Sequence, residues 1–210
     1  MKIITLFPHG FGSNTYILTS DNKTAVVIDP SSPRVKDKLF QLQLVPAHVI
    51  LTHCHFDHVY GVPALQAAGA TVHIGEKEKP LVGTGAVLSA LFGAAEPNYS
   101  VDETFSDGQE KTLCGIKIKA LHTAGHTAGG VTYLITDEKD EKGEKHLFTG
   151  DVLFDGSIGR TDFPTGDLAA LRNSLRRIRD LEGDYPLYSG HGDQTTLQTQ
   201  RKTNPFLLDL

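Results

Sequence analysis

Hydrophobic and polar positions along the chain follow two periods. Short runs rich in β-branched residues and bounded by turn residues predict strands, because alternate side chains of a strand face opposite sides. These runs occupy 2–7, 14–19, 24–29, 47–52, 70–75, 115–122, 130–136, 145–151 and 186–190. The turn residues at 20–23 and the charged stretch DEKDEKGEK (137–145) predict hairpin connections, the second a solvated tip rather than an interaction tail.

A helical period appears between the strands. It is weaker over 33–44 and 61–68 and clearest in DLAALRNSLRRIRDL (167–181). In that segment one helical face carries Leu168, Leu171, Leu175, Ile178 and Leu181. Asp167 or Thr165 is suited to cap its start. Strands and helices alternate without a linker or a repeat, which predicts a single α/β domain over 1–210, with two packed sheets and helices outside.

Composition narrows the classes of function. The chain has 210 residues and a net charge of −5, which gives no electrostatic reason to bind nucleic acid or an anionic membrane. Two cysteines, Cys54 and Cys114, are too few for a disulfide framework, so we expect a reducing, cytoplasmic location. The first apolar stretch ends at Pro8, too early for a signal peptide, and no run reaches the length of a membrane span.

The segment THCHFDHV (52–59) concentrates imidazoles between a predicted strand and a predicted helix. His53 and His55 are two positions apart, so they can converge on one centre in an extended loop. Asp57 and His58 can turn toward a second centre. Nitrogen and oxygen ligands of this kind suit zinc, and also iron or manganese. The cluster therefore predicts a metal site.

Later segments offer further ligands at strand ends, each beside glycines. They are His126 in HTAGHTAGG, Asp151 in FTGDVLF and His191 in YSGHGD. Together with the first loop they make five histidines and two aspartates, enough for two metals. His122 is a candidate hydrogen-bond partner of a ligand. The other histidines are interpreted as surface or strand residues: His9, His48, His73 and His146.

Taken in order, THCHFDH, HTAGHTAGG, FTGDVLF and SGHG, with VVIDP before them, resemble the metallo-β-lactamase superfamily of hydrolases over nearly the whole chain. The resemblance implies a four-layer αβ/βα sandwich with the site at one edge of the two sheets. It also implies that Asp151 bridges two metals. The implied first metal is bound by His53, His55 and His126, and the second by Asp57, His58 and His191.

A bridging Asp151 is typical of the thioesterases, lactonases and nucleases of that superfamily. IGRTDFPTGD (158–167) and GHGDQTTLQTQRKTNPFL (191–208) are similar to the short bacterial glyoxalase II type, the hydroxyacylglutathione hydrolases. This implies cleavage of S-lactoylglutathione-type thioesters by metal-bound hydroxide, with Asp57 taking its proton. Longer members carry a C-terminal helical domain that contacts glutathione, and this sequence ends about where it would begin. Metal chemistry is therefore better indicated than glutathione specificity.

Substrate contacts are less well defined. Arg160 is a candidate partner for a substrate carboxylate or for Asp162, and Arg201 and Lys202 are weaker candidates. The apolar segment 83–100 is a pocket wall, a lid, a subunit contact or core. Cys54 is interpreted as a packed thiol that points away from the ligands beside it.

The rival interpretations use the same fold. One is a persulfide dioxygenase with a single iron, and another is a lactonase or other ester hydrolase. A ribonuclease is disfavoured by the acidic balance, and a metal-holding regulator by the intact ligand set. We expect two divalent metals, zinc first, a small-molecule substrate and no nucleic acid or membrane partner. Oligomerisation stays open.

Overall fold

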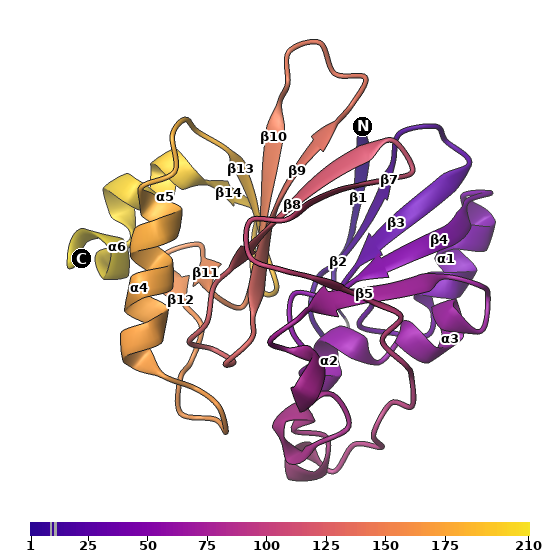
Figure 1. Ribbon diagram of the computed structural model, residues 1–210, viewed down its shortest axis with the longest axis horizontal. Coiled ribbons are helices and arrows are strands. Elements are labelled where there is room, and N and C mark those ends of the chain that lie inside the picture. Colours follow the sequence, from indigo (N-terminus) through magenta and orange to yellow (C-terminus); the bar gives the residue numbers. More distant parts are fainter. Residues whose placement is uncertain (9, 11) are drawn as a thin grey trace.

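The computed structural model describes residues 1–8, 10 and 12–210, and within them the strands form two six-stranded sheets and a two-stranded ribbon (Figure 1). The first sheet runs in the order β1 (Lys2–Leu6), β2 (Thr15–Thr19), β3 (Thr24–Ile28), β4 (Val45–Ile50), β5 (Thr71–Gly75) and β6 (Glu103–Phe105). The second runs in the order β14 (Thr195–Thr196), β13 (Pro186–Ser189), β10 (Lys145–Gly150), β9 (Val131–Asp137), β8 (Ile116–His122) and β7 (Glu110–Leu113). The ribbon pairs β11 (Leu153–Phe154) with β12 (Ser157–Ile158).

Helices cover the outer face of each sheet. Beside the first sheet lie α1 (Val35–Gln41), α2 (Phe56–Val59) and α3 (Val62–Gln66). Beside the second lie α4 (Leu168–Arg179), α5 (Leu197–Thr203) and α6 (Pro205–Leu208) (Figure 1). Short 3₁₀ turns follow β5: η1 (Lys79–Leu81), η2 (Gly85–Val87) and η3 (Ala90–Phe92). The layers are therefore helix, sheet, sheet and helix, which confirms the predicted four-layer sandwich.

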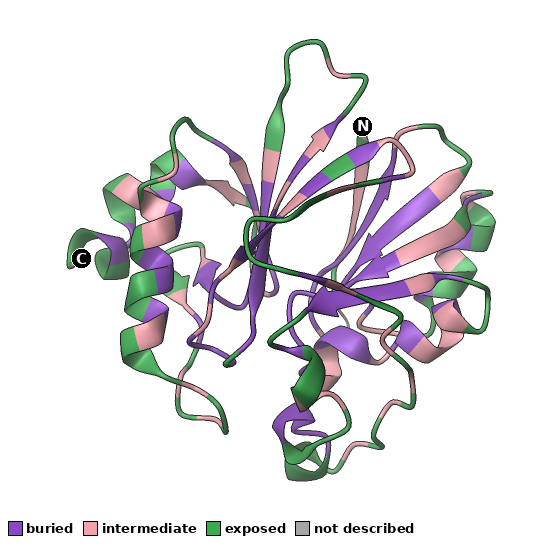
Figure 2. Ribbon diagram, viewed as in Figure 1, coloured by how far each residue is buried: buried purple, intermediate pink, exposed green. Residues whose placement is uncertain are grey.

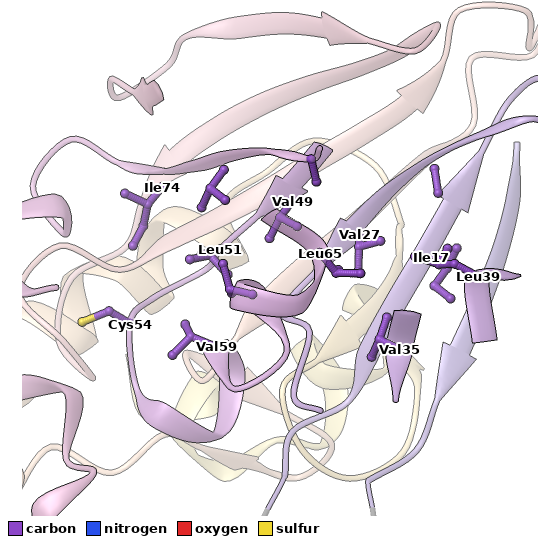
Figure 3. Close-up of a cluster of buried hydrophobic side chains, with 14 of the residues drawn as sticks. Ile17, Val27, Val35, Leu39, Val49, Leu51, Cys54, Val59, Leu65 and Ile74 are labelled. Carbon is purple, nitrogen blue, oxygen red and sulfur yellow. The ribbon is translucent and has the colours of Figure 1, made fainter. Parts of the chain in front are cut away.

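The alternation of side chains along the strands divides the interior into separate cores. On β2, Ile17 packs in the cluster shared with α1 and α3, whereas Tyr16 and Leu18 pack between the two sheets. Because both faces of such strands are buried, they read as continuous apolar runs in the sequence. Figure 2 shows the buried residues concentrated along the central strands, and Figure 3 shows the cluster between the first sheet and its helices. A third cluster lies under α4 to α6.

Helix α4 follows the predicted pattern except at its ends, since it stops at Arg179, before Leu181. Leu171, Leu175 and Ile178 are buried against the second sheet, but Leu168 is 53% exposed. Asp167 caps the helix, since its carboxylate accepts a hydrogen bond from Ala170 N at 2.9 Å. The first turn of α4 thus holds the capping contact, and the buried apolar face of the helix begins after this turn, at Leu171.

The long strands lie within two residues of their predicted bounds, and the hairpin connections at 20–23 and 137–145 are confirmed by antiparallel pairing of the flanking strands. The predicted helices at 33–44 and 61–68 are real but shorter. The elements β6, β7, β11, β12, β14, α2, α5 and α6 were not predicted, and all of them except α5 have only two to four residues, too few for a period to be read. In the described parts of the chain, no helix has the length and apolar character to cross a bilayer.

Candidate metal centre

The predicted ligands meet at one edge of the two sheets. His53 and His55 follow β4, and Asp57 and His58 lie in α2 directly after them. His126 lies in the connection from β8 to β9. Asp151 follows β10 and His191 follows β13, which is parallel to β10, so both strands deliver their next residues to the same edge.

Side-chain nitrogens and oxygens of these residues form overlapping groups. One atom each from His53, His55 and His126 lies within 4.8 Å of the others, and the same holds for Asp57, His58 and His191. We call these the first group and the second group. Asp151 lies between them: its Oδ2 is 3.5 Å from His126 Nε2 and 3.4 Å from His191 Nε2. The structure therefore brings together all seven residues that the sequence indicated.

Several atoms of this cluster are buried without a protein partner. Among the residues that the structure describes, His53 Nε2, His55 Nε2, His58 Nε2 and Asp151 Oδ1 are buried and make no hydrogen bond. Leaving such an atom unsatisfied costs about 1–3 kcal/mol, so a cluster of them needs a compensating ligand. Converging imidazole nitrogens and carboxylate oxygens at this spacing fit divalent cations.

A buried aspartate orients the histidines from behind. The Nδ1–H of His58 donates to Asp29 Oδ2 at 2.9 Å, which leaves its Nε2 lone pair facing the centre. Thr52 donates its hydroxyl to the same oxygen at 2.6 Å and accepts from His53 Nδ1 at 3.0 Å. Asp29 thus supports one histidine directly and one through Thr52. Sequence reasoning quoted Asp29 within VVIDP without giving it this role.

Backbone groups also contribute to the arrangement. The Arg160 carbonyl accepts from His126 Nδ1 at 2.8 Å, which turns the Nε2 of that ring toward the centre. Beside His191, a Cβ added at Gly190 would lie 2.7 Å from His58 Cε1 and overlap Asp151 Oδ1. Only glycine lets the chain pass this close to two of the clustered side chains.

Glu78 joins the two loops that carry the first group. Its Oε1 accepts from Cys54 N at 3.0 Å, between His53 and His55. Its Oε2 accepts from Thr127 Oγ1 at 2.8 Å and from Gly129 N at 3.0 Å, in the loop that follows His126. The side chain is fully buried, and burial raises the pKa of its carboxyl group. Sequence reasoning missed this residue, because EKEKP looks like an exposed turn.

The two groups differ in protonation. Burial, reinforced by neighbouring histidines, lowers the pKa of His55 to about 3 and holds the pKa of His53 well below its usual value. Burial also opposes the charged form of His58, but Asp151, Asp57 and Asp29 outweigh it and raise the pKa of His58 well above the usual value. For His191, hydrogen bonds with Asp151 and Asp57 overcome burial and raise the pKa to about 9.

A cavity of about 400 Å³ opens in front of the clustered side chains. His55, Asp57, His126, Asp151 and His191 form part of its lining, so the cluster faces a space of the size that small ligands occupy. The rest of the lining is mostly apolar: Phe56, Leu88, Phe92, Phe154, Ile158 and Phe163. Leu88 and Phe92 show that the segment 83–100 contributes a wall of this cavity, which was one of the alternatives for it.

The candidate substrate contacts are divided between two places. Arg160 lines the cavity and is paired with Asp162, with both nitrogen–oxygen distances at 2.7 Å. The structure places Arg201 and Lys202 on α5, outside that lining, so it adds no support to their candidate role as substrate contacts. The Arg201 guanidinium donates to the carbonyls of residues 179, 181 and 183 and so ties α5 to the end of α4, while Lys202 is exposed.

The remaining candidates have structural surroundings. Cys54 is buried in the cluster of Figure 3, where burial raises the pKa of its thiol, as expected for a packed cysteine. His122 Nε2 lies 3.1 Å from the Ala128 carbonyl, within the loop that carries His126, and is not in either group. His73 is buried and 3.1 Å from His48, and His146 lies 3.3 Å from the Tyr188 hydroxyl. His9 lies outside the described residues.

Comparison with known proteins agrees with this geometry. The family model described as "Metallo-beta-lactamase superfamily" matches residues 9–191. Over 206 residues the chain is 35% identical to a Haemophilus influenzae protein named "Hydroxyacylglutathione hydrolase GloC", covering 94% of this chain and 93% of that one.

Two solved structures superpose on nearly the whole chain. The structure titled "BLEG-1 B3 metallo-beta-lactamase" superposes with a TM-score of 0.87 at 32% identity and covers 98% of this chain and 99% of its own. The structure titled "TTHA1623 in a di-iron-bound form" superposes with a TM-score of 0.80 at 33% identity and covers 99% and 100%. Both have the same fold as this chain.

Proposed function

This chain belongs to the metallo-beta-lactamase superfamily of metal-dependent hydrolases, and on that premise we propose that it is a dinuclear thioesterase acting on S-lactoylglutathione-type acyl thioesters. The observation that carries the proposal is the pair of adjacent candidate ligand groups, with Asp151 between them, at the floor of a cavity of about 400 Å³. The similarity to a protein named hydroxyacylglutathione hydrolase supports the choice of substrate.

In this proposal the first group would hold one divalent ion and the second group another, and Asp151, which lies between the two groups, would offer its carboxylate to them. Zinc is our first choice of metal, and the similarity to a structure described as di-iron-bound makes iron the next. When bound, such ions lower the pKa of a water and polarise a carbonyl group. The carboxylates of Asp57 and Asp151 offset part of the ions' charge.

The residues of the chain place and activate the reactants. Asp57 lines the cavity, with its Oδ2 3.3 Å from His191 Nε2 and 3.8 Å from His58 Nε2. Burial raises the pKa of Asp57, but His58 and His191 outweigh it and lower the pKa below the usual value, so the side chain stays ionised. An ionised Asp57 accepts a hydrogen bond from the attacking water, orients it and takes up its proton. The thiolate that leaves needs little protonation.

The test is hydrolysis of S-lactoylglutathione by purified protein, followed by the loss of thioester absorbance. Metal content is measured in the same sample, before and after a chelator and after reloading with zinc or iron. We expect turnover that the chelator abolishes and the metal restores. Absence of turnover in protein that holds two metal ions would refute the thioesterase.

A second candidate is a persulfide dioxygenase that uses a single iron. The observation in its favour is a further compact set, His53, His58 and Asp151, which combines two histidines with one carboxylate. Oxygen uptake with glutathione persulfide in the iron-loaded protein, without thioester hydrolysis, would support it. A lactone, a simple ester and a β-lactam are tested as further substrates. The β-lactam is included because the chain is similar to a structure titled B3 metallo-beta-lactamase.

A further inference from the structure

We propose that the cavity selects thioesters by their acyl group, and that it prefers a bulky aromatic or apolar acyl substituent to a small one. The inference rests on the proposed thioesterase function and specifies its substrate class. It concerns the walls of the cavity, whereas the proposed function concerns the floor.

The walls consist mainly of large apolar side chains from segments on both sides of the ligands. Phe56 begins α2, Leu88 directly follows η2, and Phe92 ends η3. Phe154 and Ile158 lie on the β11–β12 ribbon, and Phe163 follows it in the loop before α4. Apolar side chains from these separate segments therefore meet around one cavity, which favours an apolar guest.

The aromatic rings lie next to the ligands themselves. The Phe163 ring is 6.1 Å from the His55 ring, centroid to centroid, and Phe154 is 6.1 Å from His191. Phe163 is also 6.1 Å from Phe92, which is 5.2 Å from Phe56. Any carbonyl group positioned at the ligands thus has an aromatic ring on either side. A substituent on that carbonyl can therefore reach these rings.

The charges of the lining indicate which end of the substrate meets the apolar wall. Among the described residues, the cavity is lined by one lysine or arginine, Arg160, which is paired with Asp162 and lies 3.7 Å above the Phe163 ring. Glutathione carries two carboxylates, and a pocket built to enclose it would offer free cations. The acyl group therefore fits the wall, and the acidic carrier extends toward solvent.

The conformation of the wall supports a binding role. Leu88 has a φ of +67°, a left-handed conformation that a leucine rarely adopts, and its buried side chain lines the cavity. Phe92 remains 48% exposed although it faces the same space. Strained backbone and exposed aromatic surface are both found at ligand sites, where the ligand covers the apolar surface.

The decisive experiment compares S-lactoylglutathione with S-mandeloylglutathione in protein of measured metal content. The two substrates share the carrier and the α-hydroxyl group and differ in a methyl against a phenyl group. Burial of the phenyl group against the wall predicts a kcat/KM that is roughly tenfold higher or more for the mandeloyl substrate. A ratio at or below one, with fast hydrolysis of the lactoyl substrate, would overturn the inference and leave the thioesterase standing.

Substitutions in the cavity wall test which side chain produces the preference for the mandeloyl substrate. Phe92→Ala is expected to lower the mandeloyl-to-lactoyl ratio of kcat/KM by roughly fivefold, because it removes one aromatic wall, with Phe92→Leu intermediate. The matched control is Phe40→Ala on α1, where the side chain is 85% exposed and outside the cavity lining, and where the ratio stays unchanged. A ratio that is the same in Phe92→Ala as in the unaltered protein would contradict the inference.

A change of carrier separates the acyl group from the thiol. When N-acetylcysteamine replaces glutathione in both substrates, the mandeloyl preference should persist within about threefold, since the carrier does not occupy the apolar wall. Loss of the preference with the uncharged carrier would place the thiol portion there and overturn the inference. If neither glutathione thioester is hydrolysed by protein that holds two metals, it is the proposed function that fails.

Discussion

The first group and the second group lie at the same cavity, but their histidines differ in pKa. His53 and His55 belong to a buried set in which imidazoles repel added protons, so their nitrogen lone pairs are free at neutral pH. His58 and His191 face Asp57 and Asp151, which stabilise a proton on each ring when no cation is present. A metal that binds the first group therefore finds His53 and His55 without added protons, whereas one that binds the second group must displace protons from His58 and His191.

Removal of the carboxylate between the groups is expected to have the largest effect. Asp151→Ala deletes the oxygens that lie 3.4 to 3.5 Å from His58, His126 and His191. Loss of a residue behind the ligands usually costs 10–100-fold, so loss of this one should lower kcat/KM by at least about 100-fold and reduce the bound metal. Metal analysis together with thioester hydrolysis checks this. Unchanged metal content and activity would remove Asp151 from the centre.

The two groups should differ in how their affinity for a metal ion depends on pH. Below the raised pKa of about 9, His191 of the metal-free protein carries a proton that a second metal must displace. The affinity of the second group should therefore rise with pH between 7 and 9, by about tenfold per unit for each displaced proton. His53 and His55 should add little to the pH dependence of the first group above pH 5, because the pKa of His55 is about 3 and that of His53 is well below its usual value.

The measurement is a competition titration with a chromophoric chelator at pH 6, 7, 8 and 9, with the competitor's own proton binding taken into account. It should resolve two binding steps whose affinities converge as the pH rises. Equal pH slopes for both steps would show that the two groups do not differ as described. Proton release on addition of metal, measured in a weakly buffered sample, provides a second readout.

Asp29 should distinguish the groups less sharply, because it supports a histidine of each. It contacts His58 directly and reaches His53 through the Thr52 hydroxyl. Asp29→Asn is expected to weaken metal binding by roughly tenfold, more in the second group than in the first. Asp180→Asn, at an exposed carboxylate after α4, is the matched control. An equal loss in both groups would indicate a general loosening instead of the specific contact.

The sequence pointed to the clustered histidines and the buried strands because their signals are local. Three imidazoles in one short segment and apolar runs such as TAVVID can be read without knowing the fold. The contacts that orient the ligands depend on residues far apart in the chain. Glu78 lies 24 residues from Cys54 and 51 from Gly129, and only the folded chain brings it between them.

The surroundings of other residues also depend on the folded chain. Arg201 looked like a substrate contact beside a family motif, but its guanidinium is occupied by carbonyls at the end of α4. Leu168 fits the helical period of α4 and is nevertheless largely exposed. Periodicity gives the face of a helix, but it does not give how far the neighbouring sheet extends along that face.

Glu78 offers the smallest expected effect and the one most specific to the first group. Glu78→Gln keeps the shape of the side chain but presents an amide N–H₂ to a set of donors: Cys54 N, Thr127 Oγ1 and Gly129 N. At least one of these donors loses its acceptor, which should lower the free energy of unfolding by about 1–3 kcal/mol. Thermal unfolding of the metal-free protein checks this, with Glu141→Gln in the exposed β9–β10 hairpin as the control.

The same substitution should weaken metal binding at the first group by only a few-fold, roughly threefold, because Glu78 holds the loops and not the imidazoles themselves. Binding at the second group should stay unchanged, since none of the three donors belongs to Asp57, His58 or His191. Loss of stability without any change in first-group affinity would mean that the loops keep their positions without Glu78. A larger loss at the second group than at the first would contradict the division of the centre into two separately supported halves.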